Sequence, residues 1–235
     1  FALATGPSSV GPQEVLDLVF RGADASVDAA TRDILLGIRL PRVVLGLLVG
    51  AALASAGAVF QALLRNPLAD PYVLGVSGGA ALAGVSVLAL GSVLTVSTQM
   101  VPIAAFAGGL LATGLLYWVS GGRGRSSPTG LLLTGVVFNS IASAGIVFLA
   151  SVSGFFEGSR IFLWLIGHLS AVEIDAVGIV ATSVFVGLAT ACALSRSLNF
   201  LALGDETAAH LGVPVESHRR ALLLATSLMV GAAVA

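Results

Sequence analysis

The side chains able to carry out chemistry are few in this chain and lie far apart in the sequence. The three histidines, His168, His210 and His218, do not have the spacing of a zinc site. The 235 residues contain no lysine, so they cannot form a Gly-x-x-x-x-Gly-Lys-Ser/Thr phosphate-binding loop. No carboxylate lies deep inside an apolar run, where it could relay protons. We therefore expect no catalytic residue, no metal site and no enzyme activity in this chain.

Two groups of charged residues remain as candidates for binding. In the first, Arg39 and Arg42 flank Pro41 immediately before a long apolar run. Proline suits the first turn of a helix, so both positive charges would oppose the helix dipole at a helix entrance. Each conflict costs less than about 1 kcal/mol. Two such conflicts side by side indicate either docking of an acidic external partner or anchoring to lipid phosphates.

The second group lies in the polar stretch 203–217, between two apolar runs. Asp205 and Glu206 suit the first turn of a short helix, and Gly212 followed by Pro214 would end it. Four apolar residues would form one edge of this element: Leu201, Leu203, Ala208 and Leu211. Because so short a helix is marginal unless it packs against something, the stretch is either a contact for a soluble subunit or an ordinary interfacial loop.

The elements that position these residues are predicted to be membrane helices. The chain is 57% hydrophobic and only 10% charged, whereas about a quarter of the residues of soluble proteins are charged. The 22 positions from Val43 to Leu64 carry no charge and, as a helix, would span about 33 Å, enough for a bilayer core. Pro67 and Pro71 then break the run at a polar turn. The lone Cys192 excludes a disulfide framework.

The same reasoning along the chain predicts an all-α, polytopic bundle of about six membrane spans in a single domain, 1–235. The spans are expected near 43–64, 72–95, 101–120, 130–153, 177–195 and from 220 onward, with a second short polar piece, Val215 to Arg220, leading into the last. The chain opens at Phe1 without Met and closes at Ala235 without a cap, so we expect a fragment of a longer polytopic protein.

The distribution of arginine predicts the orientation. The connections 65–71, 121–129 and 196–219, with Arg220 at the boundary, would share one side and hold six of the eleven arginines. The positive-inside rule places that side in the cytoplasm. The segments 1–42 and 154–176 then face outward, which makes 1–38 an external segment and puts Arg39 and Arg42 on the disfavoured side.

Five motifs in order along the chain resemble the FecCD family, the permease subunits of binding-protein-dependent ABC importers for iron chelates, haem and cobalamin. They are Arg39-Leu40-Pro41-Arg42, Gly50-Ala51-Ala52-Leu53-Ala54 with Phe60-Gln61, Asn66-Pro67-Leu68-Ala69-Asp70-Pro71-Tyr72-Val73-Leu74-Gly75, Leu131-Leu132-Leu133-x-Gly135, and Leu201-Ala202-Leu203-Gly204-Asp205-Glu206. The resemblance covers residues 39 to about 234 and implies further spans before Phe1 and after Ala235.

The resemblance implies roles for particular residues. Arg39 and Arg42 match arginines that face acidic side chains of the external binding protein. The stretch 203–217 matches cytoplasmic coupling helices that sit in a cleft of the ATPase subunit, through six positions: Gly204, Asp205, Glu206, Ala208, Leu211 and Gly212. A last set matches the cytoplasmic gates of the transport path: Asn66 and Leu68 in the first turn, and Ser127, Pro128 and Thr129 in a second gate loop. Pro128 departs from the small hydroxyl residue of the family.

The resemblance also implies an assembly in a bacterial or archaeal cytoplasmic (inner) membrane. Two permeases, as a homodimer or a pseudo-dimer with a paralogue, would contact lipid, two ABC ATPase subunits that hold ATP and Mg, and a periplasmic or lipid-anchored substrate-binding protein. No nucleic acid and no cofactor in this chain are expected. The implied cargo is a ferric siderophore first, then haem or cobalamin.

Two alternatives stay open at this point. The chain could be a stand-alone, gradient-driven carrier without an ATPase partner, although such a carrier would need an ionisable residue in mid-membrane, and we find none. In the outward segment 157–173, which resembles a short external helix of the family, His168 could contact a chelate or simply be solvated near an interfacial Trp164.

Overall fold

The structure is a computed structural model that describes residues 2–3, 11–21, 27–94, 97–120, 128–167, 169 and 174–235. Every regular element in these ranges is helical, which confirms the predicted all-α class. The α-helices are α1 (Pro12–Arg21), α2 (Ala29–Asp33), α3 (Leu40–Leu64), α4 (Val76–Leu94), α5 (Val101–Ser120), α6 (Pro128–Val152), α7 (Phe155–Ile166), α8 (Ile174–Ala193), α9 (Ser195–Leu203), α10 (Asp205–His210) and α11 (Val215–Val234). A π turn, Ile34–Arg39, precedes α3, and a 3-10 turn, Thr98–Met100, precedes α5.

The six predicted spans correspond to α3, α4, α5, α6, α8 and α11. Among the described residues, three continuous helices are long and apolar enough to cross a membrane alone, Ala29–Leu64, Val101–Ser120 and Pro128–Val152. The pair α8 and α9 makes a fourth if it is one span bent by 61°. In α4 the apolar helix is shorter, at Val76–Gly91. The chain is therefore a multi-pass membrane protein, and the count of six is approximate.

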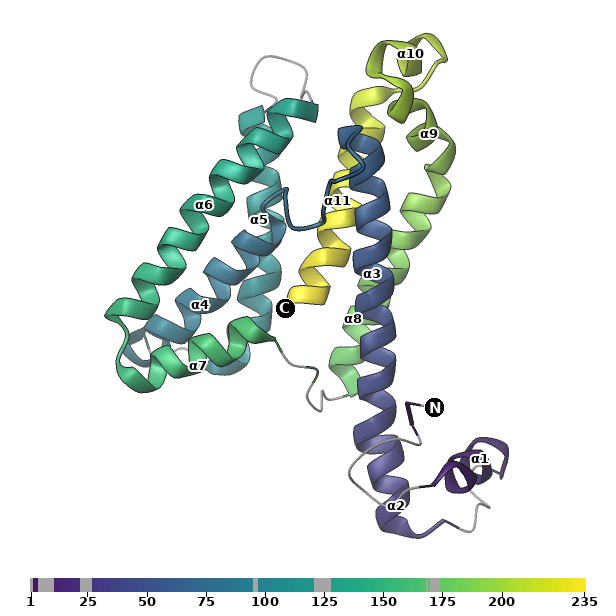
Figure 1. The fold of residues 1–235 in the computed structure, drawn as a ribbon, viewed down its shortest axis with the longest axis vertical. Helices are drawn as coiled ribbons and strands as arrows, with labels where there is room; N and C mark the ends of the chain where they lie inside the picture. Colours follow the sequence, from purple (N-terminus) through teal and green to yellow (C-terminus); the bar gives the residue numbers. More distant parts are fainter. Residues whose placement is uncertain are drawn as a thin grey trace.

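The long helices form two groups that α11 joins (Figure 1). One group contains α3, α8 and α9, and the other contains α4, α5, α6 and α7. Helix α11 packs against α3 and α8 on one side and against α5 and α4 on the other. Its buried Met229 and Val230 share an apolar cluster with Ala52 and Ala56 of α3 and Val184 of α8. Helix α11 therefore joins the two groups at the centre of the bundle.

Helices α4 and α5 cross closely because glycines face each other at the crossing. A Cβ added at Gly79 would lie 2.6 Å from the carbonyl oxygen of Gly108, and one added at Gly108 would collide with the carbonyl oxygen of Gly79. Small residues at such crossings let helix backbones approach where lipid offers no hydrophobic driving force for association. The α4–α5 pair is accordingly the most extensive helix contact of the second group.

The start of the first span differs from the prediction. We expected a helix entrance at Pro41, but the helix runs without a break from Ala29 to Leu64, with Pro41 buried inside it. The π turn Ile34–Arg39 accommodates the proline, and the Leu40 amide bonds the Leu35 carbonyl five residues back. Because proline cannot donate and crowds the carbonyl four residues back, a wider turn just before it relieves the conflict. Arg39 and Arg42 therefore do not oppose a helix N-terminus.

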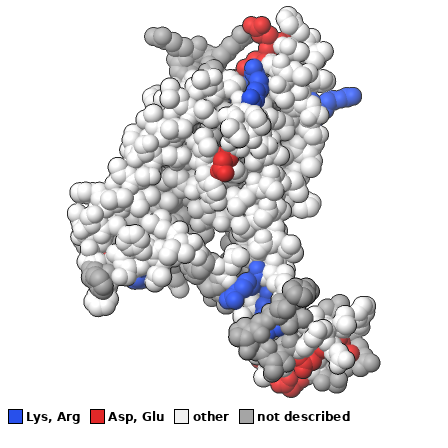
Figure 2. All heavy atoms as spheres, viewed as in Figure 1, with Lys and Arg blue, Asp and Glu red and all other residues white. Residues whose placement is uncertain are grey.

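The predicted grouping of the connections by side holds for the described residues. The end of α3 and the helix α10 lie at one end of the molecule, here called the α10 end, and α1, α2 and α7 lie at the opposite end, here called the outer end (Figure 1). On the face in Figure 2, most charged side chains gather near these two ends. Which end faces the cytoplasm stays a prediction.

Two expected loops at the α10 end are helical instead. Residues 196–203, expected to be connecting loop, belong to α9, and Val215 to Arg220 is not a separate polar piece but the first part of α11. Pro128 and Thr129, expected in a gate loop, form the first turn of α6, where proline is favoured because the first amide has no helical partner. Ser127 lies outside the described residues.

Candidate functional site

The turn that follows α3 is tightly hydrogen-bonded. Arg65 ends the helix in the left-handed region, at φ 51°, a common way for a helix to stop. The Gln61 side-chain amide donates to the Pro67 carbonyl at 3.0 Å, and the Asn66 side-chain oxygen accepts from the Leu68 amide at 3.0 Å. Leu68 itself is 86% exposed. The polar turn predicted between the first two spans is therefore confirmed, with Asn66 in the turn's hydrogen bonding and Leu68 projecting outward.

The short helix predicted around Asp205 is also present. Gly204, at φ 126°, separates α9 from α10, and Gly212, at φ 82°, follows its end. Both angles are positive, which glycine adopts without the steric cost of a Cβ. Asp205 and Glu206 occupy the first turn, where acidic side chains favour the helix dipole. The glycines and the acidic pair together explain why six residues form a separate helix here.

One face of α10 is fixed by ion pairs. The Asp205 carboxylate bonds Arg65 at the end of α3 and accepts from Arg219 of α11 at 2.7 Å. Arg219 is 2% exposed and also lies 3.6 Å from the Glu216 carboxylate. A buried guanidinium is tolerated only with such partners, because an uncompensated buried charge costs several kcal/mol. We call Arg65, Asp205, Glu216 and Arg219 the charged clamp.

A second contact ties the start of α11 to α5. The Tyr117 hydroxyl of α5 donates to Glu216, and the Arg220 Nε donates to the Tyr117 oxygen. The Arg220 guanidinium also lies over the Tyr117 ring, 5.3 Å from its centroid, which adds a cation–π attraction. Through Glu216 the charged clamp thus joins three long helices, α3, α5 and α11, to the short helix α10.

The predicted apolar edge of the coupling stretch is divided between two faces. Ala208 and Leu201 are fully buried, in a cluster with Phe60, Leu63 and Leu64 of α3. By contrast, Leu203 is 68% exposed and Leu211 is 55% exposed, and Glu206 is exposed as well. The buried pair holds α9 and α10 on the bundle, while the exposed residues form a face that the described part of the chain leaves uncovered.

At the outer end, Arg39 and Arg42 lie in the continuous first helix. The Arg39 Nη1 donates to the Leu3 carbonyl at 2.7 Å, so this arginine ties the start of the chain to the helix. Arg42 is exposed, and no ion pair to it is found among the described residues. Helix α7, which we expected within the outward segment, is present and carries an exposed Arg160.

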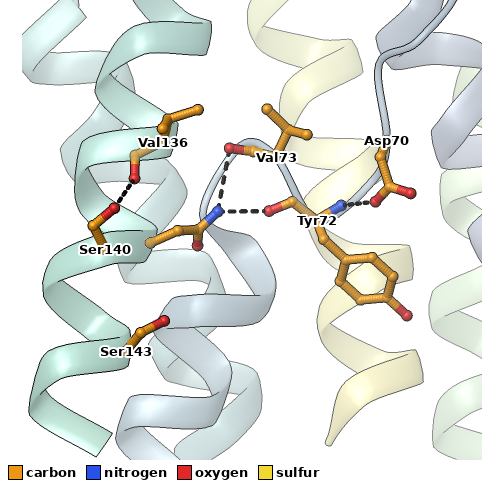
Figure 3. Close-up of a pocket in the computed structure, with 7 residues that line it drawn as sticks. Asp70, Tyr72, Val73, Val136, Ser140 and Ser143 are labelled. Carbon is orange, nitrogen blue, oxygen red and sulfur yellow. Dashed lines mark hydrogen bonds between the residues drawn. The ribbon is translucent and has the colours of Figure 1, made fainter.

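Sequence reasoning missed a shallow, open depression beside α6, with a volume of about 450 Å³. It is lined by the stretch before α4 and by one face of α6: Asp70, Tyr72, Val73, Val136, Asn139, Ser140 and Ser143. Asn139 donates to the carbonyls of Tyr72, at 2.9 Å, and Val73, at 3.4 Å (Figure 3). A side-chain amide inside the apolar run 130–153 was the signal, because polar groups within spans are costly unless they are used.

The remaining candidates do not come together. His210 lies in α10 and His218 in α11, and no group of three metal-ligating side chains occurs in the part of the chain that the structure describes. His168 lies outside that part. Cys192 is exposed on α8.

The sequence profile of the FecCD transport family matches residues 1–235. The chain belongs to the FecCD transport family. It is 40% identical over 205 residues to the cobalamin import system permease protein BtuC of Halobacterium salinarum, covering 87% of this chain and 54% of that protein. It is 36% identical over 242 residues to the hemin transport system permease protein HmuU of Yersinia pestis, covering 99% of this chain and 70% of that protein.

A solved structure shares the fold of this FecCD chain. A transporter assigned to the metal-chelate type of ABC transporters, in an inward-facing conformation, superposes with a TM-score of 0.80 at 24% identity. The superposition covers 90% of this chain and 67% of the other. The chain therefore spans between about half and about two thirds of the length of the proteins it matches.

Proposed function

We propose that this chain is the membrane-spanning part of an ATP-driven importer that moves a metal chelate across the cytoplasmic membrane. The observation that carries the proposal is the family match along all 235 residues, joined to a separate short helix braced at one end of the bundle. The relatives are named for import of cobalamin and hemin, both of which are metal chelates. The choice of a ferric siderophore as cargo stays a prediction.

In this proposal the chain performs no chemistry, and its partners supply the energy. These 235 residues lack the lysine of a phosphate-binding loop, so we assign ATP and Mg binding to separate ATPase subunits. Their closing and opening would act on two permease copies, as a homodimer or a pseudo-dimer. ATP would shift the permease between its states only through its different affinity for each of them.

The two ends of the molecule would meet different partners. The exposed face of α10, with Glu206, Leu203 and Leu211, would contact the ATPase, which makes the α10 end cytoplasmic. Arg39 and Arg42 would attract acidic side chains of an external binding protein. Docking is favoured over lipid anchoring for Arg42 because its guanidinium is exposed on a helix that continues outward for more than two further turns, to Ala29.

Reconstitution would test this function directly. The full-length permease is assembled in proteoliposomes with its cognate ATPase and binding protein, and uptake of a labelled chelate is followed. We expect uptake to require ATP and the binding protein, and to stop when the glutamate that activates water in the ATPase is changed to Gln. Uptake without an ATPase that collapses with an ionophore would establish the gradient-driven alternative instead.

The cargo is testable on the binding protein, which selects the chelate before the permease meets it. Affinities for cobalamin, haem and a ferric hydroxamate, measured by tryptophan quenching, should differ by orders of magnitude. A preference for a free amino acid or sugar over all three would contradict transport of a metal chelate.

A further inference from the structure

Residues 66–75, the segment between α3 and α4, lie between α10 and α6 and contact both of them. From the end of α3 it runs back toward the middle of the bundle before α4 begins (Figure 1). Non-helical backbone at membrane depth is tolerated only when its polar groups are satisfied by protein. The side chains that bond the backbone of residues 66–75 therefore show which helices this segment joins.

On the α10 side, the segment shares a buried apolar cluster with α9 and α10. Ala69 and Leu74 are 5% and 3% exposed and belong to the same cluster as Leu201 of α9 and Ala208 of α10. Leu131 of α6 is in this cluster too. Close-packed interiors are not continuously deformable, so a displacement of α10 must either move the segment or open a void beneath it.

Within the segment, hydrogen bonds leave little slack. The Ala69 amide donates to the Asn66 carbonyl at 3.0 Å, and the Asp70 carboxylate accepts from the Tyr72 amide at 2.7 Å. The Val73 amide then donates to the Asp70 carbonyl at 3.1 Å. Because consecutive turns are bonded in this way, the segment can carry a displacement instead of absorbing it.

On the α6 side, three residues spaced by four hold the segment against one face of the helix. Leu131 packs in the cluster, Gly135 allows close approach, and Asn139 donates to the carbonyls of Tyr72 and Val73. A Cβ at Gly135 would collide with the Val73 carbonyl oxygen, and one at Gly78 would collide with the side-chain oxygen of Asn139. Both glycines are therefore needed for the Asn139 contact to form.

We propose that residues 66–75 are a relay that passes movement of α10 to α6, and that Asn139 is the positioning residue that fastens the relay to α6. This inference rests on the proposed function, because α10 is moved only if an ATPase binds it. Asn139 contacts no cargo in this scheme. It sets where α6 stands by holding the backbone carbonyls of Tyr72 and Val73, the first of which also accepts from the Gly75 amide at 3.3 Å.

The experiment uses the full importer in proteoliposomes, with Cys192→Ala as background and a fluorophore on a cysteine at Val147 of α6 or at Ala209 of α10. Both labelled positions are exposed. In the unaltered importer, ATP should change the emission of both labels. In Asn139→Leu, which has similar size but no donor, the α10 label should still respond while the α6 response falls at least about fivefold, the low end of allosteric coupling.

A second variant reaches the same contact from the other side. Gly78→Ala should displace the Asn139 amide and give the same split between the two labels, with cargo moved per ATP falling in parallel. Ser151→Ala is the matched control, because among the described contacts the Ser151 hydroxyl bonds only the Val147 carbonyl within α6. This control is measured in importer that carries no label at Val147. Ser151→Ala should leave the amount of cargo moved per ATP unchanged.

The outcomes separate the relay from the function beneath it. A full α6 response in both Asn139→Leu and Gly78→Ala, with assembly intact, would overturn the relay while leaving the importer standing. If the unaltered importer neither hydrolyses ATP with its partner nor moves either label, the proposed function fails and the relay falls with it. If Asn139→Leu does not assemble, Gly78→Ala and Asn139→Asp decide the question by the same two labels.

Discussion

The two charged ends of this molecule are built differently. At the α10 end, Arg219 binds both Asp205 and Glu216, which reach α3 and α5 through Arg65 and Tyr117. At the outer end, Arg39 and Arg42 lie on a single helix, and Arg42 is exposed. A clamp that joins four helices resists movement of one helix relative to the others. Exposed charges on one helix can bind and release a partner without disturbing the fold.

This difference suggests how the ends divide the work. A surface that receives a mechanical push needs its short helix fixed to the long ones, because an unsupported six-residue helix would bend or melt instead. A docking surface needs complementary charge and fast release of its partner. Exposed charges provide the complementary charge, because they attract the partner at long range with little cost in stability. Each of the three predictions changes one charged residue at one end and compares it with a second charged residue at the same end.

The largest effect should come from removing the buried guanidinium of the charged clamp. Arg219→Met removes the buried guanidinium that Asp205 and Glu216 share. Because these carboxylates are 36% and 33% exposed, the loss should be smaller than the roughly 3–5 kcal/mol of a fully buried pair. We expect a large fall in the thermal midpoint of the purified permease in detergent. Arg220→Met is the comparison, because Arg220 is next in sequence but 61% exposed, and its loss removes only the solvent-facing contacts to Tyr117 and Glu216, so we expect a smaller fall. Equal losses in the two variants would show that Arg219 does not hold α10 in place.

The second effect separates the two acidic residues of α10. Asp205→Asn should destabilise the permease, because Asp205 accepts from both Arg65 and Arg219. Glu206→Lys should leave permease stability unchanged and weaken ATPase binding about tenfold or less, as loss of about 1.4 kcal/mol would. Thermal midpoints and pull-down of the ATPase at graded concentration measure the two effects. A Glu206→Lys variant that binds the ATPase normally would remove the exposed face of α10 from the interface.

Sequence reasoning predicted α10 and the turn after α3 well because local residue types determine both. Pro67 and Pro71 stop one helix, and Gly204, Gly212 and Pro214 isolate another, whatever the rest of the chain does. The partners of Asp205 could not be found in this way. Arg65 lies 140 residues away in the chain, and only the packing of α3 against α9 and α11 brings it near.

The errors arose where a local signal was outweighed by its neighbours. Pro41 normally indicates a helix start, but the π turn before it let the helix continue. Residues 196–203, which follow the predicted span 177–195, were expected to be a connection, yet they belong to α9, which buries Leu201 against the bundle. Asn139, an amide inside an apolar run, was not predicted as a site. Its partners are backbone carbonyls, and backbone leaves no signature in the sequence.

The smallest effect should come from the outer end. Arg42→Glu should weaken docking of the binding protein about fivefold at low salt, since an exposed charge pair contributes at most about 1 kcal/mol. The loss should shrink toward zero at 1 M salt, where the Debye length is about 3 Å. Affinity is measured on the permease in nanodiscs at both ionic strengths.

Arg160→Glu on α7 is the control for net charge, because Arg160 is also exposed at the outer end. If Arg160→Glu weakens docking equally, the binding protein senses only the overall charge of that end. If Arg42→Glu instead alters stability in anionic nanodiscs and leaves docking unchanged, Arg42 serves lipid phosphates. The outer arginines would then anchor the fold to the membrane. Of the contrast between the two ends, only the conclusion about the fixed α10 end would stand.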